Sequence, residues 1–296
     1  MEKVRFTEDI YASYKNLLFA LAYRMMGSVV EAEDIVHEAF LSLQGAEPER
    51  ITHLKSYLCK IVTNRCIDRL RSAQKQREVY IGPWLPEPLV TDRAGGGSDP
   101  YQAYAQHESL STAYLLLLQQ LSWVERAVFL LREVLQYDYE EIAAIVGKSS
   151  TNCRQIFHRA KRSIHTDAGR QTAASSASPD HQRLVEQFVS ALTSGDMGKL
   201  MNILTQDATL FSDGGGKVTA AVRPILGAAR ITSFLEGVRM KIASDFSCKF
   251  VFVGGEPGLV TYSGGAAGSV LSFRIEQGRI AGIYIVVNPD KLTLVR

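Results

Sequence analysis

Apolar residues recur every three or four positions through most of the first half of the chain, a spacing that places them on one face of a helix. The pattern predicts two helices within 8–44 and a longer helix over 53–77. It predicts a further helix over 108–118 and another that begins at Ser122, whose capping-box partner is Glu125. This part of the chain is therefore expected to be all-helical.

Capping signals divide residues 138–165 into two helices joined by a turn. Asp138 and Glu141 have the spacing of a capping box, and Gly147 is placed to end the first helix in the left-handed conformation. Ser149 is a second N-cap, and apolar residues at helical spacing follow it. Two helices joined in this way predict a helix-turn-helix, whose second helix typically enters the major groove of DNA.

The second of these helices carries a polar face opposite its apolar stripe. Hydroxyl, amide, imidazole and guanidinium groups are the side chains that read base edges and hold phosphates. The candidate DNA-reading residues are Ser150, Asn152, Arg154, Gln155, His158 and Arg159.

The net charge of +2 conceals three charged blocks. Residues 1–49 carry 4 Lys and Arg against 9 Asp and Glu, whereas 50–78 carry 8 against 2 and 142–170 carry 6 against 1. An acidic block favours a protein partner, and two basic blocks favour two contacts with a polyanion. Ordinary solvated helix faces would give the same charge pattern, and this alternative stays open.

The helix predicted over 53–77 has a cationic side. Its polar residues lie away from the apolar stripe, and they include Asn64, Arg65, Asp68, Arg69 and Arg71. Guanidinium groups that follow phosphates suit single-stranded DNA, but duplex DNA would use similar residues. The helix alone does not distinguish the two.

Two segments, 79–107 and 169–180, lack any periodicity and read as linkers. The first contains the sequence WLPEP, whose two prolines stiffen it. Its residues Trp84, Leu85 and Pro86 would either dock on a neighbouring domain or fill a gap in their own domain.

Residues 181–296 change character. Helical spacing marks 184–192, 200–204 and 228–240. Strand composition marks ATLF at 208–211, KFVFV at 249–253, LVTY at 259–262, VLSFRI at 270–275 and IAGIYIVV at 280–287. Helices combined with an antiparallel sheet predict an α+β domain.

The remaining composition argues against several classes of site. Cys59, Cys66, Cys153 and Cys248 have no metal-binding or redox spacing, so we expect no metal and no cofactor. The sequence has neither a signal peptide nor an apolar run long enough for a membrane span. We therefore expect a cytoplasmic protein with no membrane partner.

The order of the three charged segments resembles bacterial sigma factors of the extracytoplasmic-function group. EAEDIVHEAFL at 31–41 is similar to the helix by which these proteins bind core RNA polymerase. SYLCKIVTNRCIDRLRS at 56–72 is similar to their promoter-melting segment, and residues 131–164 are similar to their promoter-reading domain.

The resemblance implies a role for each matching residue. Asp34 and Glu38 are implied to contact polymerase, and Asn64, Arg65, Asp68, Arg69 and Arg71 the opened strand of the −10 element, beside a base pocket at the 47–53 loop. Ser150, Asn152, Arg154, Gln155, His158 and Arg159 are implied to read the −35 duplex. Cys153 and Ile156 depart from the common family pattern, so the resemblance does not establish the usual −35 base preference.

Residues 181–296 resemble the SnoaL-like cone. WLPEP, DGGGK at 213–217 and NPDKL at 288–292 are similar to motifs of the sigma factors that carry such an extension. The extension is implied to take the regulatory place of a separate anti-sigma protein. We expect interdomain contacts, against the sigma domains or the WLPEP linker, from Trp84, Leu85, Pro86, Asp213, Lys217, Asp290 and Lys291.

The whole chain is thus expected to be a multidomain promoter-specificity subunit that binds core RNA polymerase and promoter DNA. The expected order is a sigma domain (1–78), a linker (79–107), a sigma domain with the helix-turn-helix (108–168), a linker (169–180) and a SnoaL-like domain (181–296).

Two other classes remain as alternatives. One is a helix-turn-helix regulator that acts without polymerase, and the other is a ligand-responsive SnoaL-like enzyme fused to a DNA-binding arm. SnoaL-like cones often hold an acid/base pair. Here His181, Asp207, Glu236 and Asp245 show no paired spacing, so no enzyme activity is expected.

Overall fold

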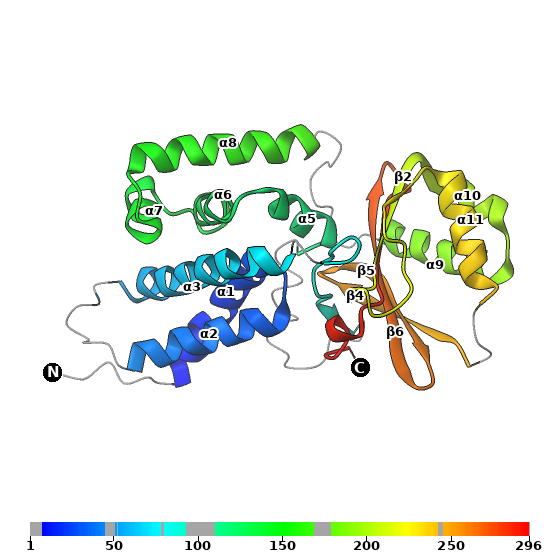
Figure 1. Ribbon diagram of the computed structural model, residues 1–296, viewed down its shortest axis with the longest axis horizontal. Helices are drawn as coiled ribbons and strands as arrows, with labels where there is room; N and C mark the ends of the chain where they lie inside the picture. The colour runs from blue at the N-terminus through cyan, green and yellow to red at the C-terminus, as the bar shows by residue number, and fades with distance from the viewer. Residues whose placement is uncertain are drawn as a thin grey trace. The chain divides into compact units, whose positions relative to one another are not determined.

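The computed structural model describes residues 8–44, 51, 53–77, 80–92, 110–168, 179–241 and 245–295. The chain forms two compact units. A helical unit comprises residues 1–78 and 115–170, and a sheet unit comprises residues 79–114 and 171–296 (Figure 1). The segment expected to link two domains, 79–107, therefore clusters with the C-terminal residues.

Helices alone build the described part of the helical unit. The elements are α1 (Glu8–Met26), α2 (Val29–Gln44), α3 (Leu54–Arg77), α5 (Thr112–Gln120, which begins in the sheet unit), α6 (Trp123–Phe129), the π-helical turn η2 (Leu130–Val134), α7 (Tyr139–Val146) and α8 (Ser150–Ala168). The helix predicted over 108–118 begins at Thr112, and residues 108 and 109 lie outside the described part of the chain.

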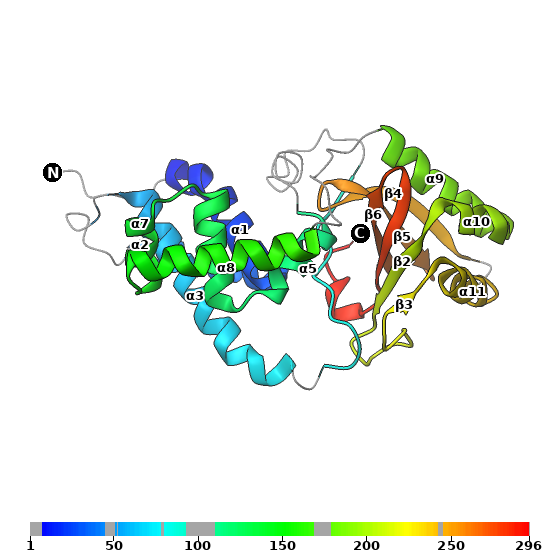
Figure 2. The same ribbon diagram turned by 90° about the horizontal axis from the view of Figure 1, so that it is seen from above.

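The predicted caps are confirmed. Ser122 and Asp138 each form a complete capping box, with Glu125 and Glu141 respectively. Gly147 ends α7 at φ 66°, a left-handed conformation that costs glycine little. The helix-turn-helix is thus present as α7 and α8 (Figure 2), and α8 packs on α6 and α7.

A buried arginine joins the two halves of the helical unit. The Arg126 side chain in α6 donates to the carbonyl oxygens of Leu118 at 2.8 Å and Leu121 at 3.4 Å, and also to the carbonyl oxygen of Met25 in α1. Arg126 is only 3% exposed. Because a buried charge is tolerated only with such partners, this side chain fixes α1 against the α5–α6 turn.

The sheet unit contains a seven-stranded sheet in the order β1-β4-β5-β6-β7-β2-β3. Its strands are β1 (Val90–Thr91), β2 (Leu204–Asp213), β3 (Ile225–Leu226), β4 (Ser247–Val253), β5 (Glu256–Ser263), β6 (Ala266–Glu276) and β7 (Arg279–Val286). The prediction of a wholly antiparallel sheet was wrong, because β2 and β7 are parallel. Between β2 and β7 the chain forms β3, a helix and the strands β4 to β6. No hairpin therefore joins β2 to β7.

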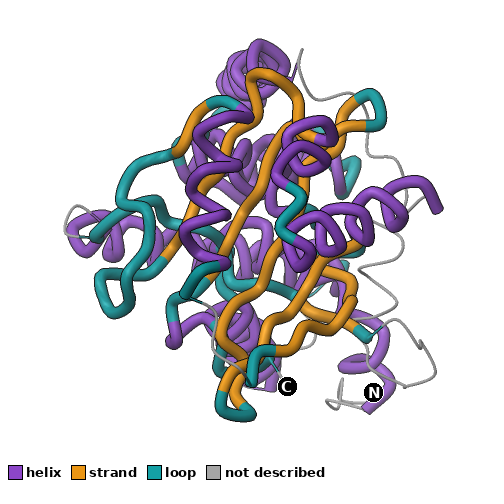
Figure 3. Tube along the Cα trace, turned by 90° about the vertical axis from the view of Figure 1, so that its right-hand side faces the viewer, coloured by secondary structure: helices purple, strands orange, loops and turns teal. Residues whose placement is uncertain are grey.

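Helices cover one face of this sheet. They are α9 (Pro179–Ser194), α10 (Met197–Ile203) and α11 (Ala228–Arg239), which lie in front of the strands in Figure 3. The core between the layers is apolar and includes a T-shaped contact between Phe188 and Phe273, with ring centroids 5.1 Å apart.

The opposite face of the sheet contacts the segment that precedes α5. Leu85 and Leu110 are almost fully buried, and the Thr112 hydroxyl lies 2.7 Å from the Ser272 hydroxyl of β6. Ser272 alternates with Phe273 along β6 and so faces away from the helices. Both faces of the sheet are therefore covered, which explains why β7 reads as an almost continuous apolar run.

Candidate functional site

The second helix of the helix-turn-helix presents the predicted DNA-reading residues to solvent. Cys153, Ile156, Phe157 and Ala160 are buried on one side of α8. Asn152, Arg154, Gln155, His158 and Arg159 are exposed on the other, and Ser150 is half-buried at its start. The structure thus brings all six onto one polar surface.

Neighbouring groups hold several cations of this surface. Arg159 lies 4.0 Å from Glu125, and Lys161 lies 3.2 Å from Glu133. Both pairs are largely exposed, so each contributes little to stability and leaves its cation available to phosphate. Arg154 instead lies over the ring of Tyr139, 5.1 Å from its centroid.

The predicted polymerase and −10 residues meet each other across α2 and α3. Arg65 pairs with Glu38 at 2.5 Å, and Arg69 pairs with Glu38 at 3.0 Å and with Asp34 at 3.7 Å. These side chains are at least 32% exposed, so the pairs are weak and exchangeable. The predicted protein-binding and DNA-binding groups therefore form one connected charged surface.

The rest of the predicted −10 surface lies further along α3. Asp68 and Arg71 are exposed and 3.7 Å apart, and Arg71 lies 4.9 Å from the ring centroid of Trp123. Asn64 is half-buried. Of the loop at 47–53 that was expected to form the base pocket, all but residues 51 and 53 lie outside the described residues.

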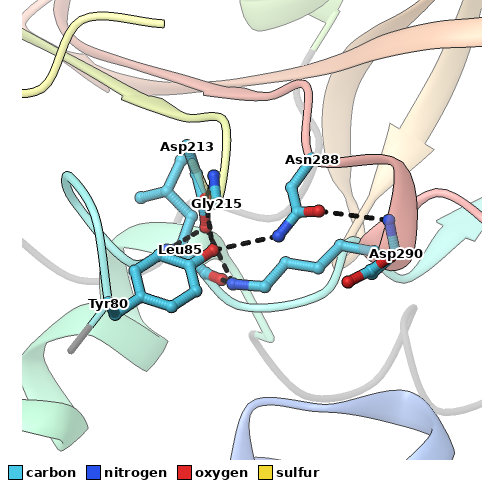
Figure 4. A network of polar contacts seen from close by, with 7 residues as sticks. Tyr80, Leu85, Asp213, Gly215, Asn288 and Asp290 are labelled. Atoms are coloured by element: carbon cyan, nitrogen blue, oxygen red, sulfur yellow. Dashed lines mark hydrogen bonds and ion pairs between the residues drawn. The ribbon is translucent and has the colours of Figure 1, made fainter. Parts of the chain in front are cut away.

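Within the sheet unit, a buried carboxylate binds the WLPEP segment to the end of the sheet. Asp213, at the end of β2, is fully buried and accepts a hydrogen bond from the Leu85 amide at 2.8 Å and from the Tyr80 hydroxyl at 2.5 Å (Figure 4). The Lys291 ammonium lies 2.7 Å from the same carboxylate and also donates to the Leu85 carbonyl. We call these residues, with Asn288, the Asp213 network.

Aromatic rings complete the surroundings of Lys291. Its ammonium lies 4.0 Å from the ring centroid of Trp84 and 5.1 Å from that of Tyr80. Burial, and then the hydrogen bond to Asp213, raise the pKa of the Tyr80 hydroxyl, which therefore remains a proton donor. A buried ion pair with this many partners fixes geometry more than it adds stability.

The structure separates the predicted interdomain residues into two groups. Leu85, Asp213 and Lys291 belong to the Asp213 network. Trp84 lies against Lys291, and Pro86 is buried beside Leu85. Lys217 and Asp290 form a separate exposed pair at 2.5 Å.

Sequence reasoning missed two members of the Asp213 network. The Asn288 side chain donates to the Tyr80 hydroxyl at 3.0 Å and accepts from the Asp290 amide at 3.1 Å (Figure 4). Asn288 caps the 3₁₀ helix η3 (Pro289–Lys291), so the Asn-Pro pair was an available signal. Nothing near Tyr80 in the sequence indicated its partner.

A pocket of about 600 Å³ lies at the edge of the sheet unit. It is lined by Met201, Asn202, Leu204, Gln206, Leu226, Gly227, Ala228, Ala229, Arg230 and Arg279. None of these lining residues is a carboxylate, histidine or cysteine, so the pocket offers no acid/base pair. His181 instead pairs with Glu256, at 3.6 Å, away from it.

The described residues contain no cluster of three or more His, Cys, Asp and Glu side chains able to hold a metal ion. None of their helices is long and apolar enough to span a membrane.

Two known family models match the helical part of the chain. Residues 10–76 match the model of Sigma-70 region 2, and residues 111–164 match that of Sigma-70 region 4. Along nearly its whole length the chain is similar to the ECF RNA polymerase sigma factor SigJ of Mycobacterium tuberculosis, with 29% identity over 96% of this chain and 92% of the relative. The chain belongs to the extracytoplasmic-function sigma factors.

Further similarities support the same family. The probable ECF RNA polymerase sigma factor SigI of Mycobacterium tuberculosis is 27% identical over 97% of this chain and 94% of its own. The crystal structure of Mycobacterium tuberculosis SigJ superposes with a TM-score of 0.77 at 26% identity and covers 97% of this chain and 98% of that chain.

The predicted order of two helical sigma regions and an α+β domain is thereby confirmed, as is the predicted function. The protein is a transcription initiation factor that directs RNA polymerase to promoters. Core RNA polymerase and promoter DNA are its partners.

Proposed function

We propose that this sigma factor reads the −35 element with the polar face of α8 and captures the opened −10 strand with α3. Asp34 and Glu38 contact core polymerase. The C-terminal domain controls how far the two sigma regions can separate, because it holds the segment that connects them. The Asp213 network carries this proposal, since one buried carboxylate on the C-terminal domain binds both the backbone and a side chain of that segment.

The length of the connecting segment limits the distance between the two sigma regions. Thirteen extended residues, such as 80–92, would span about 45 Å at 3.3–3.6 Å per residue. While the segment is bound to the sheet it cannot contribute this length. Release from Asp213 would return it, and a tethered domain rebinds readily because its effective concentration is high.

The ion pairs of Glu38 with Arg65 and Arg69 support a second element of the proposal. Binding of Glu38 to polymerase would remove a carboxylate from two cations of α3. Those cations would then face DNA phosphates without competition, so polymerase binding and −10 capture would favour each other.

The proposed function involves no covalent step. Unstacking a −10 base costs about a few kcal/mol, which base capture and phosphate contacts offset. In this scheme the C-terminal domain acts in the place of a separate anti-sigma protein, and the protein works in the cytoplasm with polymerase.

The test is promoter-specific transcription in vitro with core RNA polymerase on the gene's own upstream region. Asp213→Asn keeps the shape of the side chain but removes the charge that Lys291 and Tyr80 contact. We expect a severalfold change in transcript yield at unchanged affinity for core polymerase. Lys217→Ala, which removes only an exposed pair, is the matched control and should leave the yield within twofold.

The outcomes separate the parts of the proposal. Equal yields from Asp213→Asn and the wild type would contradict control through the connecting segment. A protein that binds the upstream DNA but not core polymerase would instead fit a regulator that acts alone.

A further inference from the structure

The first residue of α7 contacts two cations. The guanidinium of Arg154, on α8, lies 5.1 Å from the ring centroid of Tyr139, and that of Arg132, before α7, lies 4.9 Å from it. Tyr139 itself has no place in the DNA-reading set of the sequence analysis. Tyr139 is half-buried and is the first residue of α7, which precedes the DNA-reading helix.

A capping box and an aromatic contact fix the position of the Tyr139 ring. Asp138 and Glu141 form the capping box that fixes the start of α7, and Tyr139 is its first residue. The ring makes an edge contact with Phe157 at 6.3 Å, and Phe157 in turn stacks on Phe129 at 6.1 Å. Because Phe157 is 7% exposed, the ring rests on the core of the helix-turn-helix.

The two cations over the ring differ in their other partners. Arg132 donates a hydrogen bond to the Tyr137 carbonyl at 2.7 Å, which commits it to the protein. Within the described part of the chain, Arg154 makes neither a hydrogen bond nor an ion pair. An arginine has five N–H donors, and those of Arg154 are therefore available to a base edge or a phosphate.

We propose that Tyr139 is a positioning residue for Arg154 in sequence reading. The ring attracts the guanidinium through its face and leaves the N–H groups at the guanidinium edge unused. An arginine restricted in this way loses less rotamer freedom when it binds a base than an arginine that is free in solvent. The proposal rests on the proposed role of Arg154 at the −35 element.

The aromatic partner of Arg154 differs in kind from the carboxylate partners of the neighbouring cations. Carboxylates hold Arg159 and Lys161, and a carboxylate competes with phosphate for the same donors. An aromatic face does not compete for donors. Tyr139 should therefore affect discrimination between base pairs, whereas loss of a phosphate contact would weaken binding to all sequences alike.

The experiment measures discrimination by the complete holoenzyme, formed with core RNA polymerase, for promoter duplexes that differ at single −35 base pairs. Tyr139 is replaced by Trp, Phe and Leu, and Arg154→Ala and the double variant Tyr139→Leu/Arg154→Ala are included. The Phe variant is the matched control, because it keeps the ring and loses only the hydroxyl.

We expect Tyr139→Leu to reduce discrimination about two- to fivefold, since a cation–π contact at an exposed site is worth that factor. Tyr139→Phe should stay close to the wild type and Tyr139→Trp should equal or exceed it. In the Arg154→Ala background, Tyr139→Leu should have no further effect. The dependence of affinity on salt should be the same for Tyr139→Leu and the wild type.

Two results would overturn the proposal. In the first, Tyr139→Leu lowers affinity equally for all duplexes, or equally with and without Arg154, which would make the ring a structural group. In the second, the Trp and Phe variants reverse their expected order, a comparison that remains informative if the Leu variant fails to fold. Full discrimination by Arg154→Ala would instead contradict base reading by Arg154 itself, separately from the role of Tyr139.

Discussion

At the scale of single residues, the glycines of DGGGK are required by a close approach rather than by the turn alone. Gly215 adopts φ 59°, and its amide donates to Asp213 at 3.0 Å. A side-chain carbon added at Gly215 would lie 2.3 Å from the Asn288 amide nitrogen. Because Asn288 also binds Tyr80, a larger residue at 215 would disturb the Asp213 network.

Gly215→Ala should therefore destabilise the sheet unit by more than the left-handed backbone alone explains. Gly264 is a matched control, with φ 60° and open space around its missing side chain. We expect Gly264→Ala to cost about 1–2 kcal/mol from backbone strain, and Gly215→Ala clearly more. Hydrogen exchange at the Leu85 amide measures the difference, and equal protection in both variants would contradict the contact with Asn288.

At the scale of elements, Arg126 connects three segments through their backbone carbonyls. It donates to carbonyls of α1, of α5 and of the turn between α5 and α6, so one side chain joins residues of region 2 and region 4. Three carbonyl groups would lose a donor without it.

Arg126→Ala should accordingly destabilise the helical unit by about 3 kcal/mol or more, through the lost hydrogen bonds to buried carbonyls and the lost packing. The effect should appear in denaturant unfolding followed by a probe in α6. Lys60→Ala, on the exposed side of α3, serves as the control and should change stability by less than about 0.5 kcal/mol. A comparable loss in both variants would rule out the special position of Arg126.

Elements that depend on local sequence were predictable. The capping boxes at Ser122 and Asp138 join residues three positions apart, and the local pattern was sufficient to find them. β1 and β3 are two residues long and carry no periodicity that could be detected. The parallel pairing of β2 with β7 joins distant segments, and strand composition says nothing about direction.

The candidate sites follow the same division. The polar face of α8 could be found because it repeats every three or four residues along one helix. Tyr80 and Asp213 are 133 positions apart, and Leu85 and Asp213 are 128 apart, so their contact depends on the finished sheet. Motif resemblance indicated that DGGGK and WLPEP matter, but left their partner open between the linker and the sigma domains.

At the scale of the whole molecule, the segment that connects the two sigma regions belongs to the same compact unit as the C-terminal domain. Residues 79–114 belong with the C-terminal domain, so a chain that ends at Arg170 would keep this segment and lose the sheet on which it rests.

In such a truncated chain, the apolar residues Leu85, Leu89 and Leu110 should become exposed. We expect limited proteolysis within 80–92 to be at least tenfold faster than in the full-length protein, because cleavage follows local opening. Mass analysis of the fragments over time measures this. Equal protection in both proteins would mean that the segment has another support.

The pairing of β1 with β4 has a consequence for the free protein. Val90 and Thr91 pair with Val253 and Phe252, so the connecting segment is the outermost strand on that side of the sheet. When it leaves, β4 becomes an edge with unpaired backbone groups, next to an apolar sheet face. Such an edge readily pairs with another chain. The released form would therefore be prone to self-association unless it is quickly engaged elsewhere, and this liability favours release on the polymerase rather than in solution.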